Sequence, residues 1–128
     1  MEMKQGLKLG NIGQIALRTS NVEEATSFYR DILGLKLLFQ MTNMAFFDCD
    51  GVRLMITLPE NEQFDRPGSI IYFRTDDIFN DYQSLRDYDV TTHGEPHMIA
   101  DMGDHELWMT FFDDKDGNPL ALMSEIRK

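Results

Sequence analysis

The feature that most constrains the fold of this chain is an internal repeat. Residues 46–51 read Phe-Phe-Asp-Cys-Asp-Gly, and residues 111–117 read Phe-Phe-Asp-Asp-Lys-Asp-Gly. In both stretches an aromatic pair runs into Asp and Gly before an apolar alternation resumes. Asp-Gly and the later Gly-Asn supply the positive φ angles that tight hairpin turns require. Each stretch therefore predicts strand, turn and strand, and the recurrence indicates a duplicated unit.

The first half of the chain predicts the element order βαβββ. Residues 12–19 alternate between apolar and polar side chains, as a half-buried strand does. Ser20 can cap the following helix, with Glu23 completing a capping box. Gly34 lies where a helix C-cap glycine belongs. Three strands are then expected, at residues 35–41, 44–49 and 52–58.

The second half predicts the same order. Residues 59–68 are polar, contain two prolines and indicate a linker. Residues 70–75 favour a strand, and Asp76 or Asp77 can cap the helix after it. Three further strands are expected at residues 96–102, 105–112 and 119–125. We therefore predict one domain over residues 1–128, with module 1 at about 12–58, the linker at about 59–68 and module 2 at about 69–125.

Composition narrows the class of protein. A chain of 128 residues corresponds to about one ordinary domain. Its net charge of −10 disfavours nucleic acid and anionic membrane surfaces as partners, although acidity also serves simple solubility. The single cysteine, Cys49, precludes an intrachain disulfide, and residues 1–9 are too polar for a signal peptide. No apolar run is long enough for a membrane span. We therefore expect a cytoplasmic protein.

Cys49 stands between two Asp residues beside a predicted turn. Negative neighbours raise the pKa of a thiol, which lowers the fraction of reactive thiolate. We therefore expect a structural role for Cys49 and not a nucleophilic one.

The repeated modules resemble the vicinal-oxygen-chelate superfamily, which includes glyoxalase I, extradiol dioxygenases, fosfomycin-resistance proteins and bleomycin-resistance proteins. The resemblance spans residues 12–125 and is carried by residues 14–17, by Ala25 with residues 28–35, and by residues 114–118. It implies an α+β fold in which two tandem βαβββ modules form an incomplete, cup-shaped mixed β-barrel. It also implies that the functional site lies on the concave face.

The enzymes of that superfamily hold a divalent metal with four side chains, which come from the first and last strands of each module. The resemblance places these positions at Gln14, Met55, Ile70 and Ala121. Hard divalent cations prefer carboxylate, imidazole or amide oxygen ligands, and only Gln14 offers one. We therefore predict no metal ligands and no cofactor, with a divalent metal at an atypical site as the alternative.

The remaining candidates for chemistry are the three histidines, His93, His97 and His105. His97 and His105 flank a predicted hairpin turn. With an even loop they lie on opposite faces of the ribbon, and with an odd loop they share a face about 13 Å apart. Under the even-loop assumption His97, Glu106 and Trp108 share one face, where the histidine and the carboxylate are a candidate acid–base pair if the protein is an enzyme. The candidate catalytic residues are His97, His105 and Glu106.

The remaining candidates line the predicted concave face. The ligand-binding residues that we predict are Gln14, Arg18, Arg53, Met55, Tyr72, Arg74, Trp108 and Met123. A mixed face with a few polar groups suits small molecules, and Met and Trp supply adaptable apolar walls or serve as core filler. The three arginines can hold an anionic ligand, or they can pair with the carboxylates of the hairpin turns.

Three functions are compatible with these features. The first is a protein that binds a small organic molecule in the cup without the usual metal centre, as bleomycin-resistance proteins do. The second is a glyoxalase- or dioxygenase-like enzyme that uses an atypical metal site or metal-free acid–base catalysis. The third is an unliganded structural or regulatory domain. In each case we expect a homodimer, because the open edge strands need cover.

Overall fold

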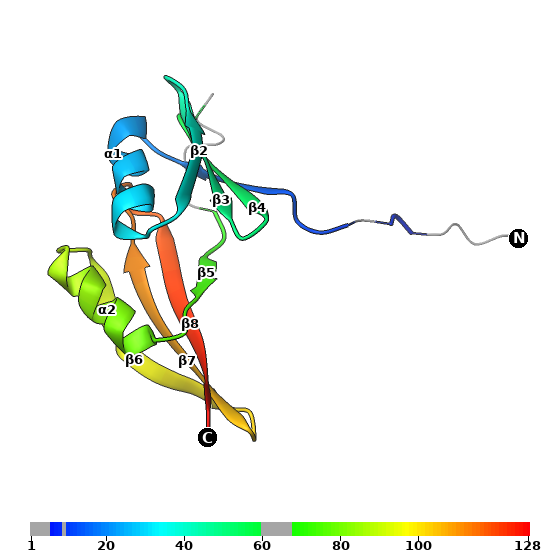
Figure 1. Cartoon of the computed structure of the whole chain (residues 1–128), viewed down its shortest axis with the longest axis vertical. Coiled ribbons are helices and arrows are strands. Elements are labelled where there is room, and N and C mark those ends of the chain that lie inside the picture. The colour runs from blue at the N-terminus through cyan, green and yellow to red at the C-terminus, as the bar shows by residue number, and fades with distance from the viewer. Residues whose placement is uncertain (1–5, 9, 60–67) are drawn as a thin grey trace, which may run out of the picture.

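The computed structural model confirms two βαβββ modules (Figure 1). It describes residues 6–8, 10–59 and 68–128, so most of the expected linker lies outside the described residues. Module 1 contains β1 (Gln14–Arg18), α1 (Val22–Ser27), the π-helical segment η1 (Phe28–Ile32), β2 (Lys36–Gln40), β3 (Met44–Cys49) and β4 (Val52–Thr57). Module 2 contains β5 (Ile71–Arg74), α2 (Ile78–Asp87), β6 (Thr92–Asp101), β7 (His105–Asp113) and β8 (Pro119–Arg127).

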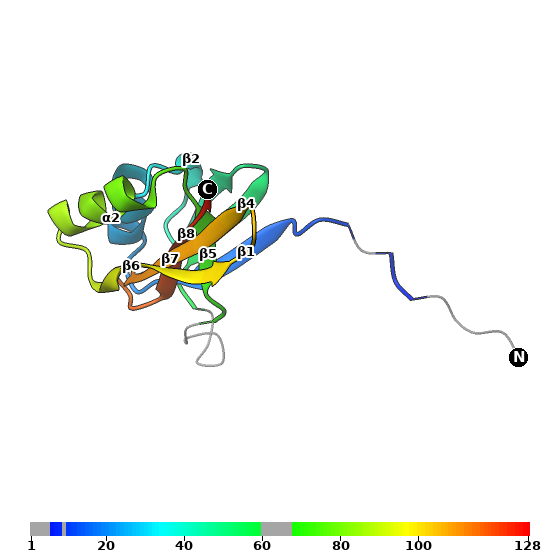
Figure 2. The ribbon, with the colours of Figure 1, turned by 90° about the horizontal axis from the view of Figure 1, so that it is seen from below.

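Each module forms one four-stranded mixed sheet. The strand orders are β1-β4-β3-β2 and β5-β8-β7-β6. In both sheets the first strand pairs in parallel with the last, and the other pairs are antiparallel. Figure 2 shows both helices on the same side of the two sheets. The fold is therefore α+β with no closed barrel among the described strands, as predicted, and no described helix is long and apolar enough to cross a membrane.

The repeated aromatic pair marks the two faces of each sheet. Phe47 and Phe112, the second residues of the pairs, are fully buried in the core beneath the helices. Phe46 and Phe111, the first residues, point to the opposite side because side chains alternate along a strand. We call the side of each sheet that faces away from its helix the cup face.

The turn between β3 and β4 confirms its sequence signal. Cys49 pairs with Val52, which leaves a two-residue loop of Asp50 and Gly51. Both loop residues have positive φ angles, 50° and 96°. Two positive φ angles match the right-handed twist of the flanking strands, so this turn fixes the register of the hairpin.

The start of α1 differs from the prediction. Asn21, and not Ser20, caps the helix, and its Oδ1 accepts a 3.1 Å hydrogen bond from the backbone N–H of Glu24. Ser20 is engaged elsewhere, because its N–H and hydroxyl both donate to Oδ1 of Asp116, at 2.7 and 2.9 Å. In module 2, Asp77 caps α2 by accepting from Asn80, so one of the two predicted caps is confirmed.

A buried polar junction joins the two modules. The carboxylate of Asp114 accepts hydrogen bonds from the Tyr29 hydroxyl at 2.7 Å and from Nδ2 of Asn118 at 2.8 Å. The backbone N–H groups of Asp116 and Asn118 donate to its other oxygen. Nδ2 of Asn118 also donates to the backbone carbonyl of Arg18, at 2.9 Å. The loop between β7 and β8 therefore anchors module 1 on module 2.

Candidate functional site

The cup face of module 1 carries a polar row beside an apolar row. The strand register defines both rows, because directly paired residues share a face. The polar row runs across β2, β3, β4 and β1 as Lys36, Asp48, Arg53 and Gln14. The apolar row beside it runs as Phe39, Phe46, Met55 and Ala16. Polar and apolar side chains therefore lie in neighbouring rows on this face.

Three predicted ligand-binding residues meet on this face. Nε of Arg53 donates to Oε1 of Gln14 at 2.6 Å, and Nε2 of Gln14 lies 3.8 Å from Sδ of Met55. The guanidinium carbon of Arg53 lies 5.1 Å from the ring centroid of Phe46. Sequence reasoning missed Phe46, although its place in the repeated aromatic pair put it opposite Met55. The result is a small cluster of a cation, an amide, a thioether and an aromatic ring.

The other two arginines make separate contacts. Arg18 donates from Nη2 to the backbone carbonyl of Asp116 at 3.0 Å, which adds to the junction between the modules. Arg74 lies 3.7 Å from the carboxylate of Glu125, and both side chains are largely exposed. Water and salt screen an exposed pair of this kind, so it contributes little to stability. The three arginines therefore do not act as one group.

The cup face of module 2 is aromatic and apolar. Tyr72 packs edge-on against Phe111, with ring centroids 6.0 Å apart. Met123 pairs with Met109 on the same face, and His97 pairs with Met109 from the other side. Three of the predicted ligand-binding residues, Tyr72, Arg74 and Met123, therefore lie on this face with a histidine at its margin.

The prediction that His97, Glu106 and Trp108 share one face is wrong. Glu106 and Trp108 do share a face, and Nε1 of Trp108 donates to Oε1 of Glu106 at 3.0 Å. That face is the helix side, because the Trp108 ring packs at 5.3 Å against Phe79 of α2. His97 lies on the cup face instead, and Trp108 does not.

A bulge in β6 explains this error. Asp101 pairs with Glu106 across a four-residue turn, so the even-loop assumption holds at the turn itself. The register then shifts by one between Met98 and Ala100. One extra residue turns every earlier side chain of β6 to the other face. β6 also begins at Thr92 and not near Pro96, past a second irregularity.

His97 and His105 share the cup face but lie apart. His97 stands opposite Met109, which is four residues from His105 along β7. That spacing corresponds to about 13 Å, which is too far for one metal ion to bind both imidazoles. Nδ1 of His105 lies 2.6 Å from Oδ1 of Asp104, and this contact holds the pKa of the Asp104 carboxyl below its usual value. Within the described part of the chain, no three or more His, Cys, Asp or Glu side chains gather as a metal site.

The four positions that the resemblance assigns to metal ligands do not suit a divalent cation. Met55 offers a soft thioether, and Ile70 and Ala121 offer no donor. The amide oxygen of Gln14 is the single hard donor of the four, and it accepts the 2.6 Å hydrogen bond from Arg53. A metal ion at this oxygen would meet a guanidinium, which always carries a positive charge.

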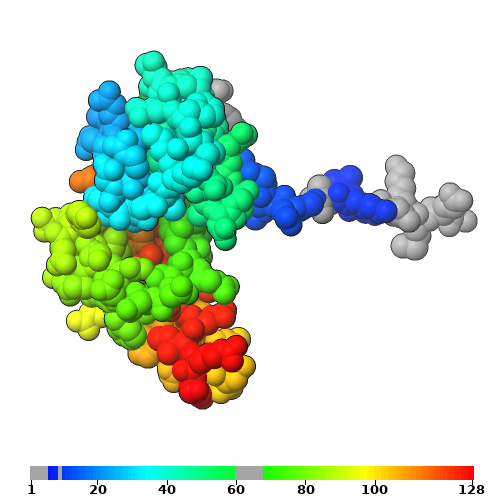
Figure 3. All heavy atoms as spheres, in the orientation of Figure 1, coloured from blue at the N-terminus to red at the C-terminus, as the bar shows by residue number. Residues whose placement is uncertain are grey.

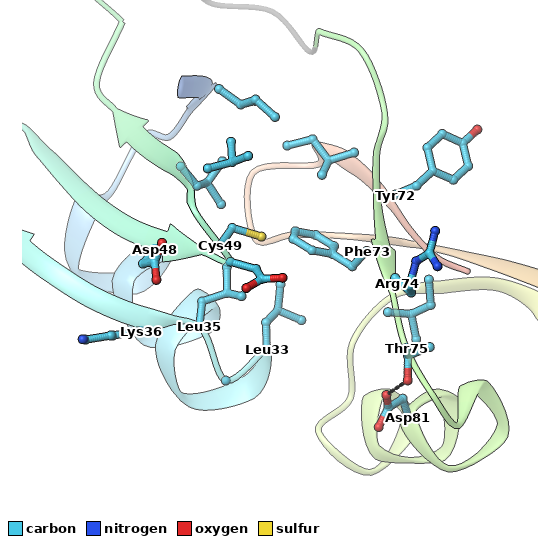
Figure 4. A pocket seen from close by; sticks show the side chains of 17 residues that line it. Leu33, Leu35, Lys36, Asp48, Cys49, Tyr72, Phe73, Arg74, Thr75 and Asp81 are labelled. Carbon is cyan, nitrogen blue, oxygen red and sulfur yellow. Dashed lines mark hydrogen bonds between the residues drawn. The ribbon is translucent and has the colours of Figure 1, made fainter. Parts of the chain in front are cut away.

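A second concave feature lies between the modules on the helix side. It is a cavity of about 710 Å³, and Figure 3 shows a depression where the modules meet. Figure 4 shows Phe73 pointing across the cavity toward Cys49, whereas Tyr72 and Arg74 point to the other side of β5. Ile15, Ile71 and Phe73 pack partly against the core and also line this cavity.

Cys49 lines this cavity, and its thiol is expected to have low reactivity. Partial burial, followed by the charges of Asp48 and Asp50, raises the pKa of the thiol above its ordinary value. The sequence predicted this direction from the two neighbouring Asp residues. A raised pKa leaves little thiolate at neutral pH, so the side chain serves as lining.

A duplicated βαβββ domain with two sheets and an open cup face defines the class of protein. Comparison with known families agrees, because residues 11–122 match the Glyoxalase/Bleomycin resistance protein/Dioxygenase superfamily. The chain belongs to this superfamily.

Individual relatives are similar to this chain in sequence or in fold. The chain is 29% identical over 117 residues to a Metallothiol transferase FosB from Staphylococcus haemolyticus, covering 87% of this chain and 81% of that protein. A crystal structure of a superfamily member from Sphaerobacter thermophilus is 26% identical with a TM-score of 0.74, covering 93% of this chain and all of the other. The structure of Lactoylglutathione lyase from Agrobacterium tumefaciens, at 19% identity, has a TM-score of 0.71 and covers 91% and 94% of the two chains.

Proposed function

We propose that this protein binds a small organic molecule on its cup face without the usual metal centre of its superfamily. The observation that carries the proposal is the 2.6 Å hydrogen bond from Arg53 to Gln14. It engages the single hard donor among the four family positions and sets a permanent cation beside it. The apolar row of Phe39, Phe46 and Met55 next to this cation supplies a wall for the rest of a ligand.

Electrostatics explains why a metal and Arg53 compete. Two like charges about 4 Å apart repel by about 4 kcal/mol at the effective dielectric of a protein surface, and a divalent ion doubles that cost. A neutral amide oxygen offers too little in return to displace the hydration water of the ion. The guanidinium therefore takes over the role of positive charge on this face.

The proposal includes a homodimer in the cytoplasm. Each sheet leaves an apolar side chain of its cup face exposed, with Phe39 at 50% and Tyr72 at 44% exposure. β2 and β6 are outer strands of their sheets, and unpaired outer strands recruit partners. A second copy that pairs along these outer strands would close the cup. Light scattering after size-exclusion chromatography tests this: twice the chain mass of 14.9 kDa supports the dimer, and a monomer at micromolar concentration contradicts it.

A thermal-shift screen tests the binding proposal. The protein is titrated with a library of small aromatic compounds, in parallel with and without EDTA. We expect at least one compound to raise the Tm equally under both conditions, because binding the folded state raises its stability. The proposal fails if no compound shifts the Tm, or if the shift disappears in EDTA and returns with added metal.

A second candidate is a metal-free enzyme that uses histidine on the cup face. It rests on carboxylate–histidine pairs: Nε2 of His93 lies 2.9 Å from Asp113, and His105 contacts Asp104. A carboxylate that orients an imidazole is a common element of acid–base catalysis. Turnover of hemithioacetal, catechol or epoxide substrates that is lost in His105→Ala would favour this candidate. Likeness to a Metallothiol transferase makes transfer of a thiol the first reaction to assay.

A further inference from the structure

The side chain of Arg53 is held in place by two contacts that leave its end free. Nε donates to Oε1 of Gln14 at 2.6 Å, and the guanidinium carbon lies over the Phe46 ring, 5.1 Å from its centroid. Within the described residues neither Nη atom has a hydrogen-bond partner. A guanidinium fixed at one edge and one face presents its remaining N–H groups in a preset direction. That arrangement lowers the entropy cost of binding a planar anion.

The charges around Arg53 permit an anion on this otherwise acidic protein. Lys36 and Arg53 lie on either side of Asp48 in the polar row, so two cations flank one carboxylate. Oδ1 of Asp48 accepts a 3.0 Å hydrogen bond from the backbone N–H of Gly51, which holds it toward the turn. With two cations and one carboxylate, the polar row therefore carries a net positive charge beside the Nη atoms of Arg53.

The neighbouring apolar row indicates what the anion is attached to. The ring centroids of Phe39 and Phe46 lie 4.7 Å apart, and the angle between the two ring planes is 32°. Met55 lies next to Phe46 in the same row. Phe39 is half exposed whereas Phe46 is 8% exposed, so the part of this surface that solvent reaches is the Phe39 ring. An aromatic or alicyclic group lying on these rings would place a substituent within reach of the Arg53 guanidinium.

We propose that the cluster of Gln14, Arg53, Phe46 and Met55 recognises a carboxylate on an apolar ring. In this arrangement the two Nη atoms donate to the two carboxylate oxygens, and the ring packs on the exposed Phe39. Paired donation from a guanidinium to a carboxylate is among the strongest hydrogen-bonding arrangements in proteins. This inference rests on the proposed function, since it names the ligand class for the same cup face.

A matched pair of probes tests the inference. 2-Naphthoate and 2-naphthamide have the same ring, but only the first carries the charge. Binding is followed by NMR titration, which includes the Nε–H resonance of Arg53. We expect naphthoate to bind at least about tenfold more tightly than naphthamide, because hydrogen bonds to a charged group add more than neutral ones, and we expect the Arg53 resonance to move with it. Equal affinities, an unmoved Arg53 resonance or no binding by naphthoate would overturn the inference.

Substitutions separate charge from geometry. Arg53→Gln is expected to remove the preference for naphthoate over naphthamide. Arg53→Lys keeps the charge but loses the planar fork, so part of the preference is expected to remain. Asp48→Asn is expected to tighten naphthoate binding by removing the nearby negative charge. Arg30→Gln is the matched control, because Arg30 is an exposed arginine that pairs with Asp31, and it should change neither affinity. A preference that survives Arg53→Gln contradicts the assignment.

The outcome also separates this inference from the proposed function. If naphthamide binds as well as naphthoate without metal, cup-face binding stands and the carboxylate assignment falls. If the chain takes up a metal ion near Gln14, the proposed function falls whatever the probes do. Circular dichroism of each variant establishes that lost binding does not reflect lost folding.

Discussion

The hydroxyl of Tyr29 donates a 2.7 Å hydrogen bond to the carboxylate of Asp114, 85 residues further along the chain. Tyr29 is completely buried and Asp114 is 8% exposed, so the bond lies in a dry environment. It joins η1 of module 1 to the loop after β7 of module 2. The bond is therefore one of the contacts that hold the two modules together, beside those of Ser20 with Asp116 and of Asn118 with Arg18.

Removing this hydroxyl should destabilise the junction. In Tyr29→Phe the ring still fills its place, but one oxygen of a buried carboxylate loses a donor. We expect the free energy of unfolding to fall by about 1–3 kcal/mol, the usual cost of leaving a buried polar group short of a partner. Urea denaturation measures the change, with Tyr88→Phe as the matched control because Tyr88 is 57% exposed. Equal stability of Tyr29→Phe and the wild type would show that the junction bond contributes nothing.

Stability should also fall at alkaline pH through Tyr29. Burial, and then the charge and hydrogen bond of Asp114, raise the pKa of Tyr29 well above its ordinary value in the folded chain. The unfolded chain releases this proton near pH 10, and the folded chain does not. The folded state therefore loses stability above about pH 10, at up to about 1.4 kcal/mol per pH unit. Urea denaturation between pH 8 and pH 11 should show this slope in the wild type and a reduced one in Tyr29→Phe.

Cys49 should react slowly with thiol reagents. Its pKa is raised by burial and by the two adjacent Asp residues, so thiolate is scarce at neutral pH. We expect the rate of modification by a disulfide reagent at pH 7.5 to rise when Asp48 or Asp50 is replaced by Asn. The matched comparison is the same rate in urea, where burial is lost. A folded protein that reacts as fast as the unfolded chain would contradict this account.

Trp108 should tolerate replacement without loss of cup-face binding. Its ring packs on Phe79 of α2 and its indole N–H is bonded to Glu106, both on the helix side. Trp108→Phe is therefore expected to change the affinity for a cup-face ligand such as 2-naphthoate less than about twofold, while lowering stability through lost packing. A loss of binding as large as that of Arg53→Gln would place Trp108 in the site after all.

The repeated module is the part of the structure that could be predicted from the sequence. The Phe-Phe-Asp pattern and the Asp-Gly turns depend on local alternation and backbone conformation, and both survive in the folded chain. The placement of Gln14, Arg53 and Met55 on one face followed from the same alternation, whereas the contacts among them did not. Features set by distant partners were not reachable. Ser20 donates its hydrogen bonds to Asp116 in the other module and does not cap the helix. The residues around Ser20 in the sequence do not indicate this distant partner.

The bulge in β6 is the clearest limit on prediction of the site. One extra residue near Ile99 reverses the faces of every position before it, His97 included. No residue type in that stretch requires a bulge, because the extra residue is accommodated by the pairing of β6 with β7. Phe46 was missed for a different reason: its role depends on Arg53 crossing from the neighbouring strand to its ring.

The metal content of the protein as purified tests the central claim most directly. Elemental mass spectrometry would be run before and after dialysis against chelator. With Arg53 engaging the single oxygen donor at the four family positions, we predict less than about a tenth of an equivalent of any transition metal. About one equivalent that survives dialysis would contradict the account, because a site would then exist despite the guanidinium at Gln14.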